Sequence, residues 1–232
     1  MFRDQAGAGL ARQFIAALHA GRVCLHPTDT LPGLTFDPTN EFGRRALIAV
    51  KGRPETKPLL ALVATPALAR SFFAPLPGDW QRLLGLLWPA PLSVVWRASN
   101  QAPKALIAAD GTIGLRVPLL HPDAAWFHYV LERLELPLPT TSVNRSGEPA
   151  ITTFAAASAF LKSEERTYSP AWDLGPTLAQ QTSTVIRLHP DGTFTLLRAG
   201  AVALDYLHSL TIRSCCGLPK SKSQLATFYP VP

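Results

Sequence analysis

The sequence predicts a single mixed α/β domain, and two observations lead to that class. Segments in which apolar residues recur at helical spacing alternate with short apolar runs typical of buried strands. The chain has 232 residues, 47% of them hydrophobic, so it can bury a large core. We find neither an internal repeat nor a linker. We therefore expect one domain over residues 1–210 and a loose tail over 211–232.

The first part of the chain predicts helices and strands in alternation. In chain order we expect a helix at 10–18, a strand at 23–26, a loop at 28–34, a helix at 42–50 and a strand at 59–63. Gly21 stands where a helix C-terminal cap belongs, and Pro27 closes the first strand. The order strand, helix, strand is typical of a βαβ unit.

The rest of the chain continues the α/β pattern and adds a hairpin. The expected helices are 66–72, 79–87, 122–134 and 154–161, and the expected strands are 92–96, 113–117, 138–142, 184–188 and 193–197. Asp191-Gly192 suits the turn between the last two strands, and Thr153 suits a helix N-cap. The mixture of helices and short strands supports an open sheet with flanking helices.

Composition narrows the partners and the compartment. The chain carries 22 Lys plus Arg against 16 Asp plus Glu, a net charge of +6, which favours an anionic partner such as a nucleotide or RNA. Cys24, Cys215 and Cys216 form neither a metal spacing nor a disulfide framework, which fits a reducing cytoplasm. No signal pattern and no apolar stretch of about 18 residues is present. We expect a soluble cytoplasmic protein with no membrane partner.

A basic turn at residues 51–58 is the first candidate for a binding site. It holds Lys51, Arg53 and Lys57 between an apolar helix and an apolar strand, and two prolines stiffen it. A stiff turn with three cations suits a polyanion, although a solvated surface turn has the same composition. Because a buried strand follows directly, we expect the cations to lie at the mouth of that strand.

Three further polar groups lie at the ends of expected strands. They are the segment 27–30, which contains Thr28 and Thr30, the segment 140–147, and the residues Thr112 and Arg116 in or next to one expected strand. Hydroxyl and guanidinium groups bind phosphates and carboxylates. The same residues also serve as turn caps, Asx turns and structural ion pairs, so each group alone leaves both interpretations open.

Other catalytic schemes lack their motifs. We find no phosphate-binding G-x-x-x-x-G-K-[ST] loop, no G-x-G-x-x-G, no H-E-x-x-H and no G-x-S-x-G. The six histidines show no metal-ligand spacing, and we expect each to be a packing or surface residue. The remaining Lys, Arg, Thr, Ser and Asn residues indicate a site that positions reactants and screens charge without a protein nucleophile or bound metal.

Taken in order, these motifs resemble the YrdC-like family of threonylcarbamoyl-AMP synthases, in its single-domain branch. The family's Lys-x-Arg and Ser-x-Asn motifs match Lys51, Arg53, Ser142 and Asn144, and its Pro-Thr-(Asp/Glu)-Thr motif matches 27–30. Further matches are 112–118, 183–185 and 198–200. The resemblance implies a twisted open mixed sheet with flanking helices around a large cationic cavity.

The resemblance also implies a reaction and a set of site residues. The reaction forms threonylcarbamoyl-AMP and pyrophosphate from L-threonine, bicarbonate and ATP, toward N6-threonylcarbamoyladenosine (t6A) in tRNA. Catalytic roles would fall to Lys51, Arg53, Ser142 and Asn144. ATP would be held by Lys51, Arg53, Lys57, Thr112, Ser142, Asn144 and Arg198, with Mg²⁺ carried by its phosphates. Threonine would be held by Thr28, Thr30, Arg116, Thr140 and Ser183.

Alternatives remain at this point. An RNA-binding paralogue without this activity would use the same basic surface for tRNA or double-stranded RNA, and other t6A-pathway proteins are expected partners of the synthase. A carbamoyltransferase-like domain shares the motifs but belongs to much larger chains. Pro32 replaces an aromatic residue common in the family, and Leu62 replaces a histidine, so both positions bear on amino-acid specificity.

Overall fold

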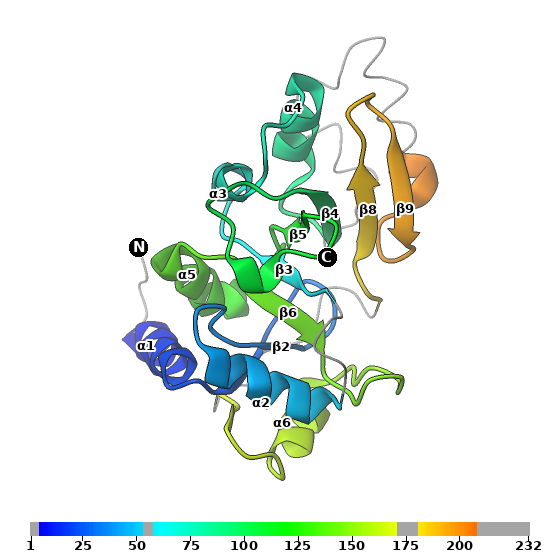
Figure 1. Ribbon diagram of the computed structural model, residues 1–232. Coiled ribbons are helices and arrows are strands. Elements are labelled where there is room, and N and C mark those ends of the chain that lie inside the picture. Colours follow the sequence, from blue (N-terminus) through cyan, green and yellow to red (C-terminus); the bar gives the residue numbers. More distant parts are fainter. Residues whose placement is uncertain (1–4, 53–57, 171–180, 208–232) are drawn as a thin grey trace.

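The computed structural model describes residues 5–52, 58–170 and 181–207. Its centre is an open mixed sheet of nine strands in the order β7-β1-β2-β6-β3-β5-β4-β8-β9, with helices packed around it (Figure 1). The strands are β1 (Val23–His26), β2 (Gly33–Thr35), β3 (Leu60–Leu62), β4 (Leu92–Arg97), β5 (Thr112–Arg116), β6 (Leu138–Ser142), β7 (Thr167–Tyr168), β8 (Thr184–Leu188) and β9 (Phe194–Arg198). The predicted fold class is confirmed.

The described helices agree closely with the predicted ones. They are α1 (Gln5–His19), α2 (Glu41–Lys51), α3 (Pro66–Phe72), α4 (Gly78–Leu87), α5 (Ala125–Leu134) and α6 (Phe154–Leu161), with short 3₁₀ turns η1 (Lys104–Leu106) and η2 (Pro122–Ala124). The predicted cap is present, because Thr153 accepts a hydrogen bond from the backbone N–H of Ala156. None of the helices in these ranges is long and apolar enough to cross a bilayer.

The predicted βαβ unit is wrong. The segment predicted as a loop contains β2, which pairs antiparallel with both β1 and β6. Since β6 in turn pairs antiparallel with β3, the strands β1 and β3 run in opposite directions with two strands between them. The cause is the length of β2, which has three residues and is too short for a periodic pattern to reveal.

Side chains alternate across the sheet and divide the core into layers. Val23 and Leu25 of β1 pack with α2 and α6, whereas Cys24, between them, packs with α1 and α5. The two helix pairs therefore cover opposite faces of this part of the sheet. A third cluster joins α3 and α4 to β3, β4, β5 and β8, and it includes the buried Trp80 and Trp88.

The α1 and α5 pair leaves part of its sheet face open. Leu138, at the start of β6, packs in the α1 and α5 cluster. Thr140 and Ser142 follow at two-residue spacing on the same face, and both line a cavity instead of the apolar core. The change from leucine to hydroxyl residues along β6 thus marks the boundary between core and cavity.

Gly200 allows the chain after β9 to lie against the start of β8. A Cβ atom there would lie 2.3 Å from the carbonyl oxygen of Thr182 and 2.5 Å from the carbonyl carbon of Ser183. The neighbouring Ala201 donates its backbone N–H to that same Thr182 carbonyl. Because backbone atoms cannot move aside as a flexible side chain would, position 200 accepts only glycine without a shift of this segment.

We predict that Gly200→Ala lowers the free energy of unfolding by about 1–3 kcal/mol, the usual cost of overpacking. Urea denaturation measures the change. Gly85→Ala is the matched control, since a Cβ at Gly85 in α4 meets open space and alanine favours a helix over glycine by about 1 kcal/mol. Equal stability of the Gly200→Ala protein and the wild type would contradict the proposed close approach.

Candidate functional site

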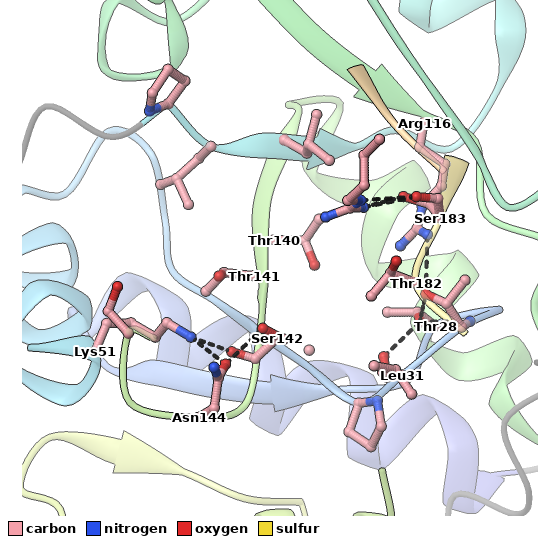
Figure 2. Close-up of a pocket in the computed structure, with 18 of the residues that line it drawn as sticks. Thr28, Leu31, Lys51, Arg116, Thr140, Thr141, Ser142, Asn144, Thr182 and Ser183 are labelled. Atoms are coloured by element: carbon pink, nitrogen blue, oxygen red, sulfur yellow. Dashed lines mark hydrogen bonds between the residues drawn. The ribbon is translucent and has the colours of Figure 1, made fainter. Parts of the chain in front are cut away.

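A cavity of about 250 Å³ opens on the sheet face beyond α1 and α5. The residues that line it come from seven separate places in the chain: 28–33, Lys51, 58–60, Arg116, 140–147, 182–183 and Arg198. Figure 2 shows Lys51, Ser142 and Asn144 together at one end and Thr28, Arg116 and Ser183 at the other, with Thr140 and Thr141 of β6 between them. Residues up to 170 positions apart in sequence thus share one cavity.

At the first end, a lysine and two polar side chains form one hydrogen-bonded group. Lys51 Nζ donates to Asn144 Oδ1 at 2.6 Å and to the Ser142 carbonyl at 2.8 Å. The Ser142 hydroxyl also donates to Asn144 Oδ1, at 2.6 Å. β6 ends at Ser142, and the turn that follows brings Asn144 beside it.

The end of α2 holds Lys51 in place. Gly52, at φ 57°, adopts the left-handed conformation of a C-cap, and its N–H bonds to the carbonyls of Ile48 and Ala49. Arg145 donates to the carbonyls of Ala49 and Val50, so it satisfies acceptors that the last helical turn leaves open. Lys51 is only 3% exposed, and its position in the last turn also suits the negative end of the helix dipole.

At the other end, the loop after β1 folds around hydroxyl groups. Thr28 Oγ1 donates to the Leu31 carbonyl at 2.7 Å and accepts from the backbone N–H of Thr30. With its hydrogen used, Thr28 Oγ1 must accept from the Thr30 hydroxyl, 2.9 Å away. Thr28 therefore stabilises the turn, as one of the two open interpretations expected, and it also lines the cavity.

Arg116 is the buried cation of this end. Its Nη1 donates to Thr30 Oγ1 at 3.1 Å and lies 3.3 Å from Asp29 Oδ1, with both charged side chains no more than 5% exposed. Asp29 Oδ2 accepts from the backbone N–H of Leu119. Burial raises the pKa of Asp29, and the charge of Arg116 opposes that shift. The structural ion pair considered from the sequence is present, and Arg116 still faces the cavity.

Arg198, at the end of β9, adds a second guanidinium to the cavity. Its Nε and Nη2 donate to the Ser183 carbonyl, and Nη2 also donates to the Ser183 hydroxyl at 2.9 Å. Burial and the charge of Arg116 both lower the pKa of Arg198. Two guanidinium groups that repel one another in a partly buried space create a positive potential, which an anion would relieve.

His26 is a buried residue that contacts Thr140 in the cavity wall. Its ring is fully buried and stacks on Phe127, with ring centroids 4.8 Å apart. Nδ1 lies 2.9 Å from the Pro27 carbonyl, and Nε2 lies 3.1 Å from Thr140 Oγ1. Burial is the main cause that lowers the pKa of His26 to about 3, so the ring is neutral at physiological pH. The sequence prediction of a packing histidine missed this contact with a cavity residue.

The structure gathers most of the predicted site residues but not all of them. Lys51, Thr28, Thr30, Arg116, Thr140, Ser142, Asn144, Ser183 and Arg198 line the one cavity. Thr112 instead donates to Asp110 and lines an adjoining, mostly apolar cavity of about 490 Å³ that shares Arg198. Arg53 and Lys57 lie outside the described residues. Sequence reasoning missed Thr182, which precedes the predicted Ser183, and it included Ser146 in the segment 140–147 without a role of its own.

This set of side chains favours binding of anions over metal chemistry. The described residues that line the cavity include lysine, arginine, hydroxyl and amide groups but no carboxylate. Over the described ranges, no three His, Cys, Asp or Glu side chains gather as a metal site would require. The arrangement can therefore position anionic reactants and screen their charges.

A model of the Sua5/YciO/YrdC family, described as "Telomere recombination", matches residues 16–200. The chain belongs to this family. A threonylcarbamoyl-AMP synthase of Halorhodospira halophila is 36% identical over 114 residues, which span 49% of this chain and 59% of that protein. A putative threonylcarbamoyl-AMP synthase of Mycobacterium leprae is 31% identical over 204 residues, 87% of each chain. The match to the first relative thus spans less than two thirds of its length.

Solved structures of the family share the fold. Sua5 of P. abyssi, complexed with L-threonine, superposes with a TM-score of 0.72 at 25% identity, over 88% of this chain and 57% of that one. YciO of E. coli superposes with a TM-score of 0.70 over 85% of this chain and 92% of that one, and its identity of 19% indicates the fold alone. The resemblance to the YrdC-like family is therefore confirmed, together with its open mixed sheet.

The low pKa of His26 predicts an acid-labile fold. Between pH 6.5 and about 3 the unfolded chain binds a proton at this histidine that the native state excludes, so the free energy of unfolding decreases as the pH falls. This one group contributes a slope of up to about 1.4 kcal/mol per pH unit. Urea denaturation from pH 7 to pH 4 should show a steeper slope for the wild type than for His26→Phe, and parallel slopes would contradict the neutral buried ring.

Proposed function

We propose that the protein is an L-threonylcarbamoyladenylate synthase, which forms threonylcarbamoyl-AMP and pyrophosphate from L-threonine, bicarbonate and ATP. The observation that carries the proposal is a single cavity with Lys51, Ser142 and Asn144 at one end and Arg116 with hydroxyl groups at the other. Relatives that are named threonylcarbamoyl-AMP synthase, and a family structure that contains L-threonine, support the choice of substrate.

In this proposal the Lys51 end holds the triphosphate. The hydrogen bonds of Lys51 Nζ to Asn144 Oδ1 and to the Ser142 carbonyl hold the ammonium at the cavity wall, where its charge can act on a phosphate. Arg198 adds charge from the far wall, and Arg53 and Lys57 follow Lys51 in the basic turn. The nucleoside would extend toward the adjoining cavity that contains Thr112.

The opposite end would hold the amino acid. Arg116 suits its carboxylate, because a guanidinium binds a carboxylate in a planar, two-pronged way and Asp29 holds this one from behind. Thr30, Thr140 and Ser183 place hydroxyl oxygens around the same space, with Thr28 supporting the loop. These groups suit the ammonium and hydroxyl of threonine.

The chemistry needs positioning more than a protein nucleophile. The threonine amine adds to bicarbonate with loss of water, and the resulting N-carboxylate attacks the α-phosphorus of ATP and displaces pyrophosphate. Both reactants are anions, and their approach costs Coulomb energy unless nearby cations offset it. Lys51, Arg116 and Arg198 supply such charges within the cavity. The described cavity residues lack a carboxylate, so we assign any Mg²⁺ to the phosphates and not to these residues.

Pyrophosphate release tests the proposal. We predict that the purified protein releases pyrophosphate from ATP and that release depends on both L-threonine and bicarbonate. Each co-substrate is omitted in turn, and the adenylate product is identified by mass spectrometry. Formation of ADP, or turnover that ignores both co-substrates, would exclude the synthase. We further propose that transfer of the threonylcarbamoyl group to tRNA requires other t6A-pathway proteins.

Loss of Lys51 should slow the reaction strongly. Lys51→Ala removes the cation that would meet the phosphate oxygens in a desolvated cavity, and one of the two donors to Asn144 Oδ1, so we predict a fall in kcat of about two orders of magnitude. Lys162→Ala is the control, because Lys162 is an exposed cation outside the cavity. If Lys51→Ala retained turnover and lost only salt-sensitive RNA binding, the basic turn would belong to an RNA surface and the catalytic role of Lys51 would be refuted.

Substitutions of the two cavity arginines should weaken the binding of different substrates. We predict that Arg116→Lys weakens threonine binding about ten- to hundredfold, the equivalent of roughly 1.5–3 kcal/mol, and changes ATP binding much less. Arg198→Lys should show the reverse preference, because we assign Arg198 to the nucleotide. Calorimetry with each ligand measures both effects, and equal losses of both ligands in Arg116→Lys would refute its assignment to the amino acid.

A further inference from the structure

The hydrogen bonds of His26 determine which way its protons point. The Pro27 carbonyl only accepts, so Nδ1, 2.9 Å away, must carry the ring hydrogen. A neutral imidazole has a single N–H, which leaves Nε2 as an acceptor. The ring has no alternative orientation nearby, because it is stacked on Phe127 and fully buried.

This arrangement fixes the acceptor to which the Thr140 hydroxyl donates its hydrogen. Since Nε2 accepts, Thr140 Oγ1, 3.1 Å away, must be the donor of that hydrogen bond. Its remaining hydrogen-bonding capacity is its lone pairs, and Thr140 lines the cavity. Thr140 therefore meets a ligand as an acceptor and not as a donor.

Gly33 makes the contact possible. A Cβ at Gly33 would lie 2.4 Å from His26 Nε2 and 3.0 Å from Thr140 Oγ1, so any other residue would separate these two atoms. Thr30 reaches the same state by another route, because it donates to Thr28 and accepts from Arg116. Two hydroxyl oxygens in the wall thus have their hydrogens used within the protein.

We infer that His26 is a positioning residue that makes Thr140 an acceptor for the amine of an amino-acid substrate, an inference that rests on the proposed function. An ammonium or an amine can donate N–H to Thr140, whereas a ligand acceptor at the same place would meet lone pairs. The direction also serves the chemistry. A hydroxyl that donated to the amine would occupy the nitrogen lone pair needed to attack bicarbonate, and an acceptor leaves that lone pair available.

Two ligands that differ only in the amine test the inference. L-Threonine and (R)-3-hydroxybutyrate share the carboxylate and the hydroxyl. The dissociation constant of (R)-3-hydroxybutyrate divided by that of L-threonine therefore isolates the contribution of the amine. We expect Thr140→Val to reduce that ratio about ten- to hundredfold and His26→Phe to reduce it about three- to thirtyfold, with (R)-3-hydroxybutyrate binding little changed. The double variant should resemble Thr140→Val, because His26 acts through Thr140.

The chain offers a matched control pair. His189 Nε2 lies 2.7 Å from Thr195 Oγ1 in the exposed β8 and β9 hairpin, away from the cavity, so His189→Phe and Thr195→Val should leave the ratio unchanged. His26→Gln supplies an amide oxygen as acceptor and should retain more of the ratio than His26→Phe. If His26→Phe does not fold, His26→Gln replaces it in the comparison. A ratio for Thr140→Val equal to that of the wild type then overturns the inference.

The outcomes separate this inference from the proposed function. If the wild type binds threonine and His26→Phe weakens both ligands equally, His26 only packs the wall and the inference is wrong. If the wild type does not bind threonine, the proposed function fails and the inference fails with it. A selective loss of the amine contribution in both Thr140→Val and His26→Phe supports the positioning role.

Discussion

The buried guanidinium of Arg116 is the constraint on which the site depends. A cation inside a protein must be compensated, and here Asp29 lies 3.3 Å away with its side chain 1% exposed. To supply that carboxylate, the loop after β1 folds inward, and its turn is held by the Thr28 and Thr30 hydroxyls. The position of the loop therefore follows from the charge on β5.

The hydrogen bonds of the Arg116 and Asp29 pair are incomplete, and further cations lie around the same cavity. Asp29 Oδ1 and Arg116 Nε have no hydrogen-bond partner within the described structure. Arg198 lies close enough to Arg116 for their charges to repel, and Lys51 adds a third cation at the opposite end. A cavity with three cations and no described carboxylate in its lining is electrostatically prepared for reactants that repel one another in water.

Hydrogen-bond direction adds a second level of order to the cavity. The hydroxyls of Thr28, Thr30 and Thr140 give their hydrogens to protein acceptors, and Ser142 gives its hydrogen to Asn144 Oδ1. These hydroxyls therefore present oxygen lone pairs, and Lys51, Arg116 and Arg198 supply the positive charge of the cavity. The hydroxyl oxygens suit a ligand group that donates hydrogen bonds, and the cations suit an anion.

Most helices and strands, the family motifs and the polar, cationic character of the site could be predicted from the amino-acid sequence. Helix spacing and apolar runs are local properties, so most helices and strands were predictable, and the Lys-x-Arg and Ser-x-Asn motifs placed Lys51, Ser142 and Asn144 together. The strand order could not be predicted in this way, because β2 is three residues long and pairs antiparallel with β6, more than a hundred residues away. The same reason applies to Asp29 with Arg116 and to His26 with Thr140. Each contact joins a residue at the end of β1, or in the loop after it, to a residue on a strand about ninety or more positions away. The burial that sets the charge of Asp29 and the protonation of His26 depends on these long-range contacts and not on a local sequence pattern.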